Sequence, residues 1–134
     1  MKGFFPDQSD HGAVTPFEYL PCGAITPKAG LALVLTNGLL ALATGATAPT
    51  YICMKDADAA VTPGTIIPVV RVDKDRIYET TNSAAFSSAK IGQKVTLHTD
   101  GLQVTATTTN GVAEIVDFDD KAKSGAGGTV HVRF

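Results

Sequence analysis

The sequence predicts an all-β fold, a small antiparallel β-barrel or sandwich built from hairpins, with at most one short helix. The main observation lies in residues 94–119, where apolar and polar side chains alternate around Asp100-Gly101 and Asn110-Gly111. These dipeptides tolerate the positive φ angles of a type I′ hairpin turn. Side chains alternate between the two faces of a strand, so Val95 and Leu97 are expected on one buried face. We interpret residues 94–119 as a three-stranded antiparallel meander.

Composition and charge narrow the class of protein. The chain has 134 residues, which suits one domain with a real core, and it is 44% hydrophobic and 18% charged. The low charge leaves apolar or neutral surface that an oligomer or a permanent partner could cover. Net charge is −2 and the Lys and Arg residues are scattered, which disfavours direct nucleic-acid binding. The longest apolar run, residues 31–43, is too short for a membrane helix, so no membrane partner is expected.

The N-terminal residues 1–16 contain two prolines and two glycines that discourage regular structure. A floppy terminus is one interpretation, and an arm that orders against a neighbouring subunit is the other, supported by Phe4 and Phe5, which are costly to leave in water. Residues 17–134 are then a single β-barrel domain. The start of the chain lacks the apolar region of a secretory signal, so synthesis in a cytoplasm without export is expected.

Further strands are expected along the middle of the chain. The apolar runs 31–35 and 39–43 flank Asn37-Gly38 and predict a second hairpin. Pro68 suggests that its strand lies at a sheet edge or contains a bulge. The remaining strand candidates are residues 17–20, 50–54, 66–72 and 77–80.

The two hairpins resemble each other. Lys28-Ala29-Gly30 precedes the first and Lys90-Ile91-Gly92 precedes the second, and the hairpin sequences align with one extra residue in the second. An internal repeat that builds two halves of a barrel is one interpretation, and chance similarity between hairpins is the other.

The C-terminal third contributes a predicted helix and a closing strand. Asn82 or Ser83 could cap a short helix that ends at Gly92. Residues 121–128, KAKSGAGG, are expected to form a flexible loop. Residues 129–134 alternate and predict a strand that closes the sheet.

No pattern of metal ligands or catalytic residues is found. Cys22 and Cys53 have no CxxC spacing and are interpreted as buried free thiols, with a disulfide left open. His98 and His131 fall on polar strand faces without the further ligands that zinc requires, so no metal site is expected.

The carboxylates and serines also lack a recognisable pattern. Asp117 and Asp119 could share a side of an extended segment, but no calcium-loop pattern accompanies them. There is no GxSxG elbow, P-loop or GxGxxG turn. We therefore expect no enzyme activity and no cofactor.

Four runs of sequence carry a resemblance to a known class of protein. They are residues 18–22 (EYLPC), 26–34 (TPKAGLALV), 48–54 (APTYICM) and 61–69 (VTPGTIIPV). With residues 94–119, they resemble small structural proteins of tailed bacteriophages and prophages, in particular head decoration (capsid cement) proteins. The resemblance covers most of the chain after residue 16.

The resemblance implies a binding function. It implies a homo-oligomer, with a trimer favoured, on the exterior of a phage capsid in the virion, where it would bind the major capsid protein. Phe4, Phe5, Phe17 and Tyr19 are the candidate contacts with the capsid or with other subunits. Alternatives are a tail or connector component, a small nucleic-acid or ligand-binding barrel, and a small hydrolase.

Overall fold

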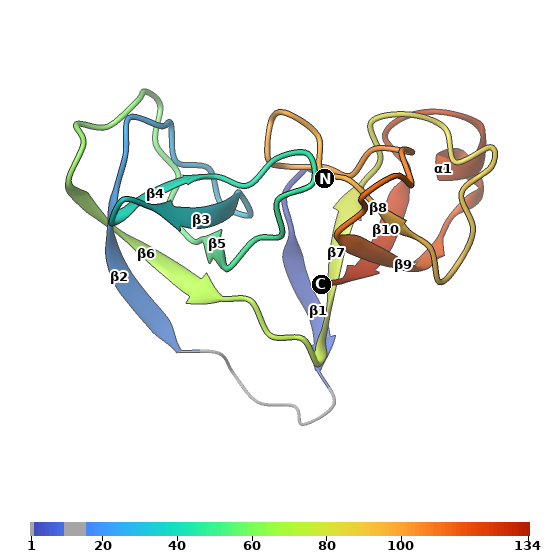
Figure 1. The fold of residues 1–134 in the computed structure, drawn as a ribbon, viewed down its shortest axis with the longest axis horizontal. Coiled ribbons are helices and arrows are strands. Elements are labelled where there is room, and N and C mark those ends of the chain that lie inside the picture. The colour runs from blue at the N-terminus through green and yellow to red at the C-terminus, as the bar shows by residue number, and fades with distance from the viewer. Residues whose placement is uncertain (1, 10–15) are drawn as a thin grey trace.

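In the described residues, the chain forms ten β-strands and one short helix, so the expected all-β class is confirmed. The computed structural model describes residues 2–9 and 16–134, and only the backbone of residues 7–9. The strands are β1 (Phe5–Ser9), β2 (Phe17–Cys22), β3 (Ala32–Thr36), β4 (Leu39–Leu42), β5 (Tyr51–Cys53), β6 (Thr65–Arg71), β7 (Arg76–Thr81), β8 (Lys94–Val95), β9 (Ala113–Phe118) and β10 (Thr129–Arg133), and the helix is α1 (Asp120–Ser124). Figure 1 shows two β-units side by side, joined by the β6–β7 connection.

The first unit is a closed barrel with the strand order β2-β4-β3-β5-β6. The predicted hairpin around Asn37-Gly38 is confirmed, because Thr36 pairs with Leu39. Both turn residues have positive φ, 51° for Asn37 and 79° for Gly38, as a type I′ turn requires. The barrel interior is filled by one cluster of buried side chains, namely Cys22, Leu31, Leu33, Leu40, Tyr51, Cys53, Ile67 and Val69.

The second unit is a five-stranded sheet with the order β1-β7-β10-β9-β8. Val104 forms single bridges to Leu97, which follows β8, and to Asn82, which follows β7. It thereby links the β8 side of the sheet to the β7 side. A second buried cluster takes side chains from both units, including Ile52 and Val70 from the first and Val130 and Val132 from the second. This shared core packs the two units against each other.

The two units repeat the same backbone pairing, which supports the predicted internal repeat. The N–H of Gly30 donates to the carbonyl of Cys53, and 62 residues later Gly92 donates to Ile115, both at 2.8 Å. The glycines have φ angles of 89° and 90°, a conformation that costs other residues strain. The repeats thus enter their hairpins through the same turn.

The repeat extends to the strand that closes each unit. Cys22 pairs in parallel with Leu40, and Asn82 pairs in parallel with Val104. The N–H of the next residue then donates to the same partner, from Gly23 to Leu40 at 2.9 Å and from Ser83 to Val104 at 2.8 Å. Each repeat therefore builds its own unit, which corrects the expectation that the repeats form two halves of one barrel.

The start of the chain belongs to the folded domain, which corrects the boundary placed at residue 16. Strand β1 pairs antiparallel with β7, with Phe5 opposite Glu79. Phe4 is fully buried and its ring meets that of Phe134 at 5.4 Å between centroids. Phe4, named above as a candidate contact with the capsid or other subunits, therefore lies inside the fold, and Phe5 is half-buried. Residues 10–15 of the predicted arm lie outside the described residues.

The predicted meander over residues 94–119 has a different strand order. Val95 and Leu97 are buried as expected. Strand β8 pairs with β9, and Leu97, just after β8, pairs with Val104. The first strand therefore lies in the middle. Leu97 pairs with Val104 where the equivalent Leu35 pairs with Leu40, so the second turn is two residues longer, not one.

The helix also lies elsewhere than predicted. Residues 83–92 contain no helix, and the short helix α1 forms in the segment expected to be a flexible loop. Asp119 caps α1 by accepting a hydrogen bond from the N–H of Ala122 at 2.9 Å. Asn82 is buried and does not cap a helix. Its Nδ2 donates to the carbonyls of Ala84, Ala122 and Gly125, and its Oδ1 accepts from Gly128.

Pro68 lies in the interior of the barrel wall, not at an edge. Strand β6 pairs with β2 on one side and with β5 on the other. The carbonyl of Pro68 accepts from the N–H of Met54, the residue directly after β5. The backbone N–H that proline lacks would point towards β5 at the position where the pairing of β5 with β6 ends. The sheet therefore tolerates the proline there.

Candidate contact surface

Exposed apolar side chains gather on the outer face of β2 and β6. In the described chain, the exposed large apolar residues are Phe17, Tyr19, Leu35, Ile66 and Ile91. Phe17, Tyr19 and Ile66 remain 51%, 65% and 57% exposed, and all three lie on this pair of strands. We call these three residues the β2–β6 patch.

The strand register explains why these residues share a face. Tyr19 lies opposite Pro68 and Pro21 lies opposite Ile66, and directly opposed residues of an antiparallel pair project to the same side. Phe17 and Tyr19 are two residues apart, so they also share that side. The alternate residues Ile67 and Val69 fill the barrel interior. The patch is thus the outward half of a strand pattern whose inward half forms the core.

An ion pair joins β2 to β6 on the face opposite the patch, because Glu18 alternates with Phe17 and Tyr19 along the strand. The guanidinium of Arg71 donates through Nε and Nη2 to the two carboxylate oxygens of Glu18, each at 3.1 Å. Arg71 Nη2 also donates to the hydroxyl of Tyr51 at 3.1 Å, and the guanidinium lies 5.0 Å from the centre of that ring. The hydrogen bond from Arg71 to Glu18 raises the pKa of Arg71. These contacts hold β2 against β6 behind the apolar patch.

The equivalent face of the second unit is polar. His131 stands opposite Glu79, as Pro68 stands opposite Tyr19 in the first. His131 Nε2 lies 3.2 Å from Glu79 Oε1, and His131 Nδ1 bonds to Asp117. His131 thus lies on the outward polar face of its strand, with its ring between two carboxylates. His98 is also partly exposed, at 3.2 Å from Asp100.

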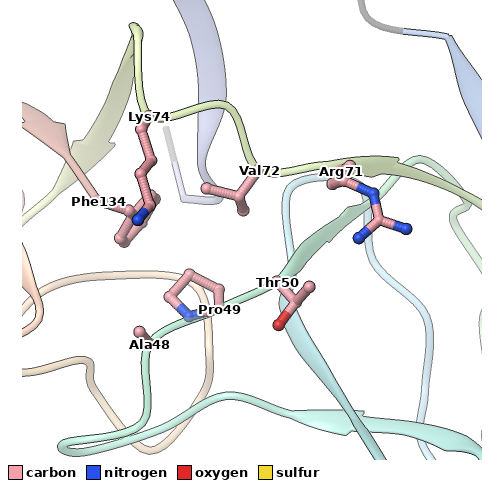
Figure 2. Close-up of a pocket in the computed structure, with 7 residues that line it drawn as sticks. All are labelled: Ala48, Pro49, Thr50, Arg71, Val72, Lys74 and Phe134. Carbon is pink, nitrogen blue, oxygen red and sulfur yellow. The ribbon is translucent and has the colours of Figure 1, made fainter.

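A hollow of about 280 Å³ lies between the two units (Figure 2). Pro49, Val72 and Phe134 form its apolar lining, and Arg71 and Lys74 are its two cationic residues. In Figure 2 the Arg71 guanidinium points away from Lys74 and Phe134. The lining contains no carboxylate side chain, histidine or thiol.

Both cysteines are buried free thiols, as predicted. Burial raises the pKa of Cys22 and that of Cys53, so both stay protonated near neutral pH. Cys53 Sγ also donates to the carbonyl of Lys55 at 3.3 Å. A protonated, buried thiol is a poor nucleophile, and these two act as small apolar residues of the barrel core.

Within residues 2–9 and 16–134, no group of three or more His, Cys, Asp or Glu side chains is arranged to hold a metal ion. Each ring nitrogen of His131 already faces a carboxylate. Over the same part of the chain, no helix has the length and apolar character needed to cross a membrane.

The structure separates the four candidate contact residues into two pairs. Phe17 and Tyr19 lie together and exposed, whereas Phe4 is buried and Phe5 is half-buried on β1. Sequence reasoning missed Ile66. Its signal was the alternation in residues 66–71, where Ile67 and Val69 take the buried positions.

No model of a protein family matches the sequence, and no curated protein matches it either.

Proposed function

We propose that this protein is a non-enzymatic structural protein of a phage virion, which binds the outer surface of the capsid as a decoration protein and stabilises it. The observation that carries the proposal is the β2–β6 patch. Three large apolar side chains lie on one wall of a closed barrel and remain more than half exposed. Exposed apolar clusters of this kind mark protein contacts.

The arrangement suits a contact that must form without rearrangement. Ile66 is held by its pairing with Pro21 of β2, and the Glu18–Arg71 ion pair joins β2 to β6 on the opposite face. A contact surface fixed before binding loses little conformational entropy when it binds. The resemblance of residues 18–22 and 61–69 to phage decoration proteins includes the strand ends that carry Tyr19 and Ile66.

The proposed partner is the major capsid protein, and the proposed assembly is a homo-oligomer on the virion exterior. Several copies joined together would gain avidity on a repeating capsid surface even if each contact were weak. The polar face around His131 would remain in solvent, since its carboxylates and imidazole satisfy one another.

A co-sedimentation experiment with expanded capsids tests the proposal. The double variant Phe17→Ser, Ile66→Ser removes most of the apolar patch, and we expect at least a hundredfold weaker capsid binding because central apolar residues dominate such interfaces. The matched control is Leu35→Ser, which removes an exposed apolar side chain from β3, away from the patch. Unchanged binding of the double variant would contradict the proposed contact.

A further inference from the structure

The repeat reveals an open strand edge in the first unit. In the second unit, β7 pairs with β10 on one side and with β1 on the other. In the first unit, β2 pairs with β6 along its whole length, but it meets β4 only where Cys22 pairs with Leu40. No described strand occupies the place on β2 that β1 occupies on β7. Figure 1 shows β2 at the rim of the molecule, with β6 beside it.

The direction of the backbone groups identifies the residues of this edge. The N–H of Gly23 donates to Leu40, away from β6, whereas the carbonyl of Cys22 accepts from Gly64, which leads into β6. Successive residues of a strand direct their backbone groups to opposite sides. Tyr19 and Phe17 therefore direct their N–H and C=O groups towards the open edge, as does Pro21, which has no N–H to leave unpaired.

We infer that the open edge of β2 pairs antiparallel with β2 of a second copy of this chain. The edge is bounded by Pro16 and Pro21, which leaves a short stretch with two outward-directed residues, Phe17 and Tyr19. This stretch is self-complementary. A two-fold axis through Glu18 places Phe17 of each copy opposite Tyr19 of the other, and each such pair exchanges two backbone hydrogen bonds.

The side chains fit this pairing on both faces of the extended sheet. Phe17 and Tyr19 form two cross-strand aromatic pairs, a favourable combination on a sheet. Glu18 comes to lie opposite Glu18 of the second copy, and each carboxylate keeps its two hydrogen bonds to Arg71, which offset the repulsion. Directly opposed residues share a face, so the two β2–β6 patches join into one surface.

The inference goes beyond the proposed function, and it is tested without capsids. The matched variants are Tyr19→Pro and Tyr19→Ala. Both remove the aromatic ring, but only proline removes the N–H that points to the edge, and the bonds to β6 come from the alternate residues. In sedimentation equilibrium of the full chain we expect a monomer–dimer equilibrium. Its dissociation constant should be about twentyfold weaker for Tyr19→Pro than for Tyr19→Ala, because each dimer loses two hydrogen bonds.

Hydrogen exchange on the unaltered chain provides a second measurement that does not depend on the folding of a variant. The amides of Phe17 and Tyr19 should exchange fast in dilute protein and become at least tenfold slower in concentrated protein. The Leu20 amide, directed towards β6, should be protected at both concentrations. Equal dissociation constants for the two variants, a monomer at all concentrations, or a trimer would overturn the inference. Protection of Phe17 and Tyr19 that appears only when capsids are added would assign the edge to the capsid protein instead.

Discussion

The two repeats share a backbone and differ in the side chains that they carry on it. At the parallel bridge, the first repeat has Cys22 and the second has Asn82. On the outward face, Tyr19 opposite Pro68 becomes Glu79 opposite His131. One repeat therefore has an apolar outer wall, and the other has a network of charges.

The repeats also differ in the additional strand and helix that accompany them. The second repeat binds β1 on β7 and forms α1 between β9 and β10, whereas the equivalent segment of the first, residues 54–64, has no helix. The Cys22 side chain packs among the apolar residues of the barrel core. At the equivalent position of the second repeat, the Asn82 side chain instead forms hydrogen bonds to residues around α1. The strand pairing thus defines the fold, and the side chains at equivalent positions decide which surface is left open.

The largest expected effect comes from removing the residue that anchors β1 to the second repeat. Phe4 is fully buried among the core residues shared by the two units, and its N–H donates to Gly30 at 2.7 Å. Phe4→Ala should lower the free energy of unfolding by about 3–5 kcal/mol, because it removes a buried ring and leaves a cavity. Urea denaturation of the purified protein measures this loss.

The neighbouring Phe5 is the matched control for this substitution. Its ring is half-buried, so Phe5→Ala should cost about 1 kcal/mol. A Phe4→Ala variant as stable as Phe5→Ala would show that β1 is not part of the folded domain in solution, and the asymmetry between β7 and β2 would disappear.

The second prediction compares the two residues at the parallel bridges. Asn82→Ala removes three donated bonds and one accepted bond of a fully buried side chain, at distances of 2.7–3.0 Å. It leaves the buried N–H of Gly128 without its acceptor, which with the lost donated bonds should cost about 3 kcal/mol in free energy of unfolding. Cys22→Ala removes one apolar sulfur from the barrel core and should cost about 1 kcal/mol.

Thermal unfolding of both variants separates these two roles, with Ser83→Ala as a control next to Asn82. If Asn82→Ala and Cys22→Ala lowered stability equally, the hydrogen bonds around α1 would add nothing to what packing gives the first repeat.

Much of the fold could be predicted because strand alternation and turn dipeptides are local signals. The Asn37-Gly38 hairpin is an example, since two residues with positive φ determine its turn. The order of strands around β8 could not be predicted, because it depends on which segments meet far along the chain. The helix was misplaced for a related reason. Asn82 resembles a helix cap in sequence, but its side chain bonds to residues about 40 positions away.

The burial of the candidate contact residues could be predicted only in part, for similar reasons. Phe17 and Tyr19 alternate with residues that face the barrel interior, and this alternation is visible in the sequence. The burial of Phe4 depends on its position between the two units, which only the packed structure reveals. The same holds for the open edge of β2, since it becomes visible only by comparison with the edge of β7.

The third prediction tests the polar network against the apolar patch. His131→Ala breaks contacts to Glu79 and Asp117 that tie β7, β10 and β9 together on the outward face. Because all three side chains are partly exposed, the loss in free energy of unfolding should be about 1 kcal/mol. Tyr19→Ala, on the equivalent face of the first repeat, should cost less than about 0.5 kcal/mol, since its side chain is 65% exposed. Urea denaturation at dilute protein concentration compares the two, and a greater loss for Tyr19→Ala would mean that the patch supports its own barrel.

The smallest effect concerns the longer turn of the second repeat. Burial raises the pKa of Asp100, but hydrogen bonds from the N–H of Leu102 at 2.8 Å, from Gln103 Nε2 at 3.0 Å and from His98 outweigh it, so the pKa lies below its ordinary value. The ionised carboxylate therefore stabilises the fold at pH values above its ordinary, unfolded pKa, and this contribution disappears as the pH falls through the lower folded pKa. Asp100→Asn keeps an acceptor for Leu102 but loses the charge, and it should cost about 0.5 kcal/mol at pH 7. Urea denaturation from pH 7 down to about pH 2 should show this difference shrinking towards zero.

The turn at Asn37-Gly38 has no carboxylate, so Asn37→Asp provides the comparison in the first repeat. A cost of Asp100→Asn that stayed constant over the whole pH range would mean that shape, not charge, holds the longer turn.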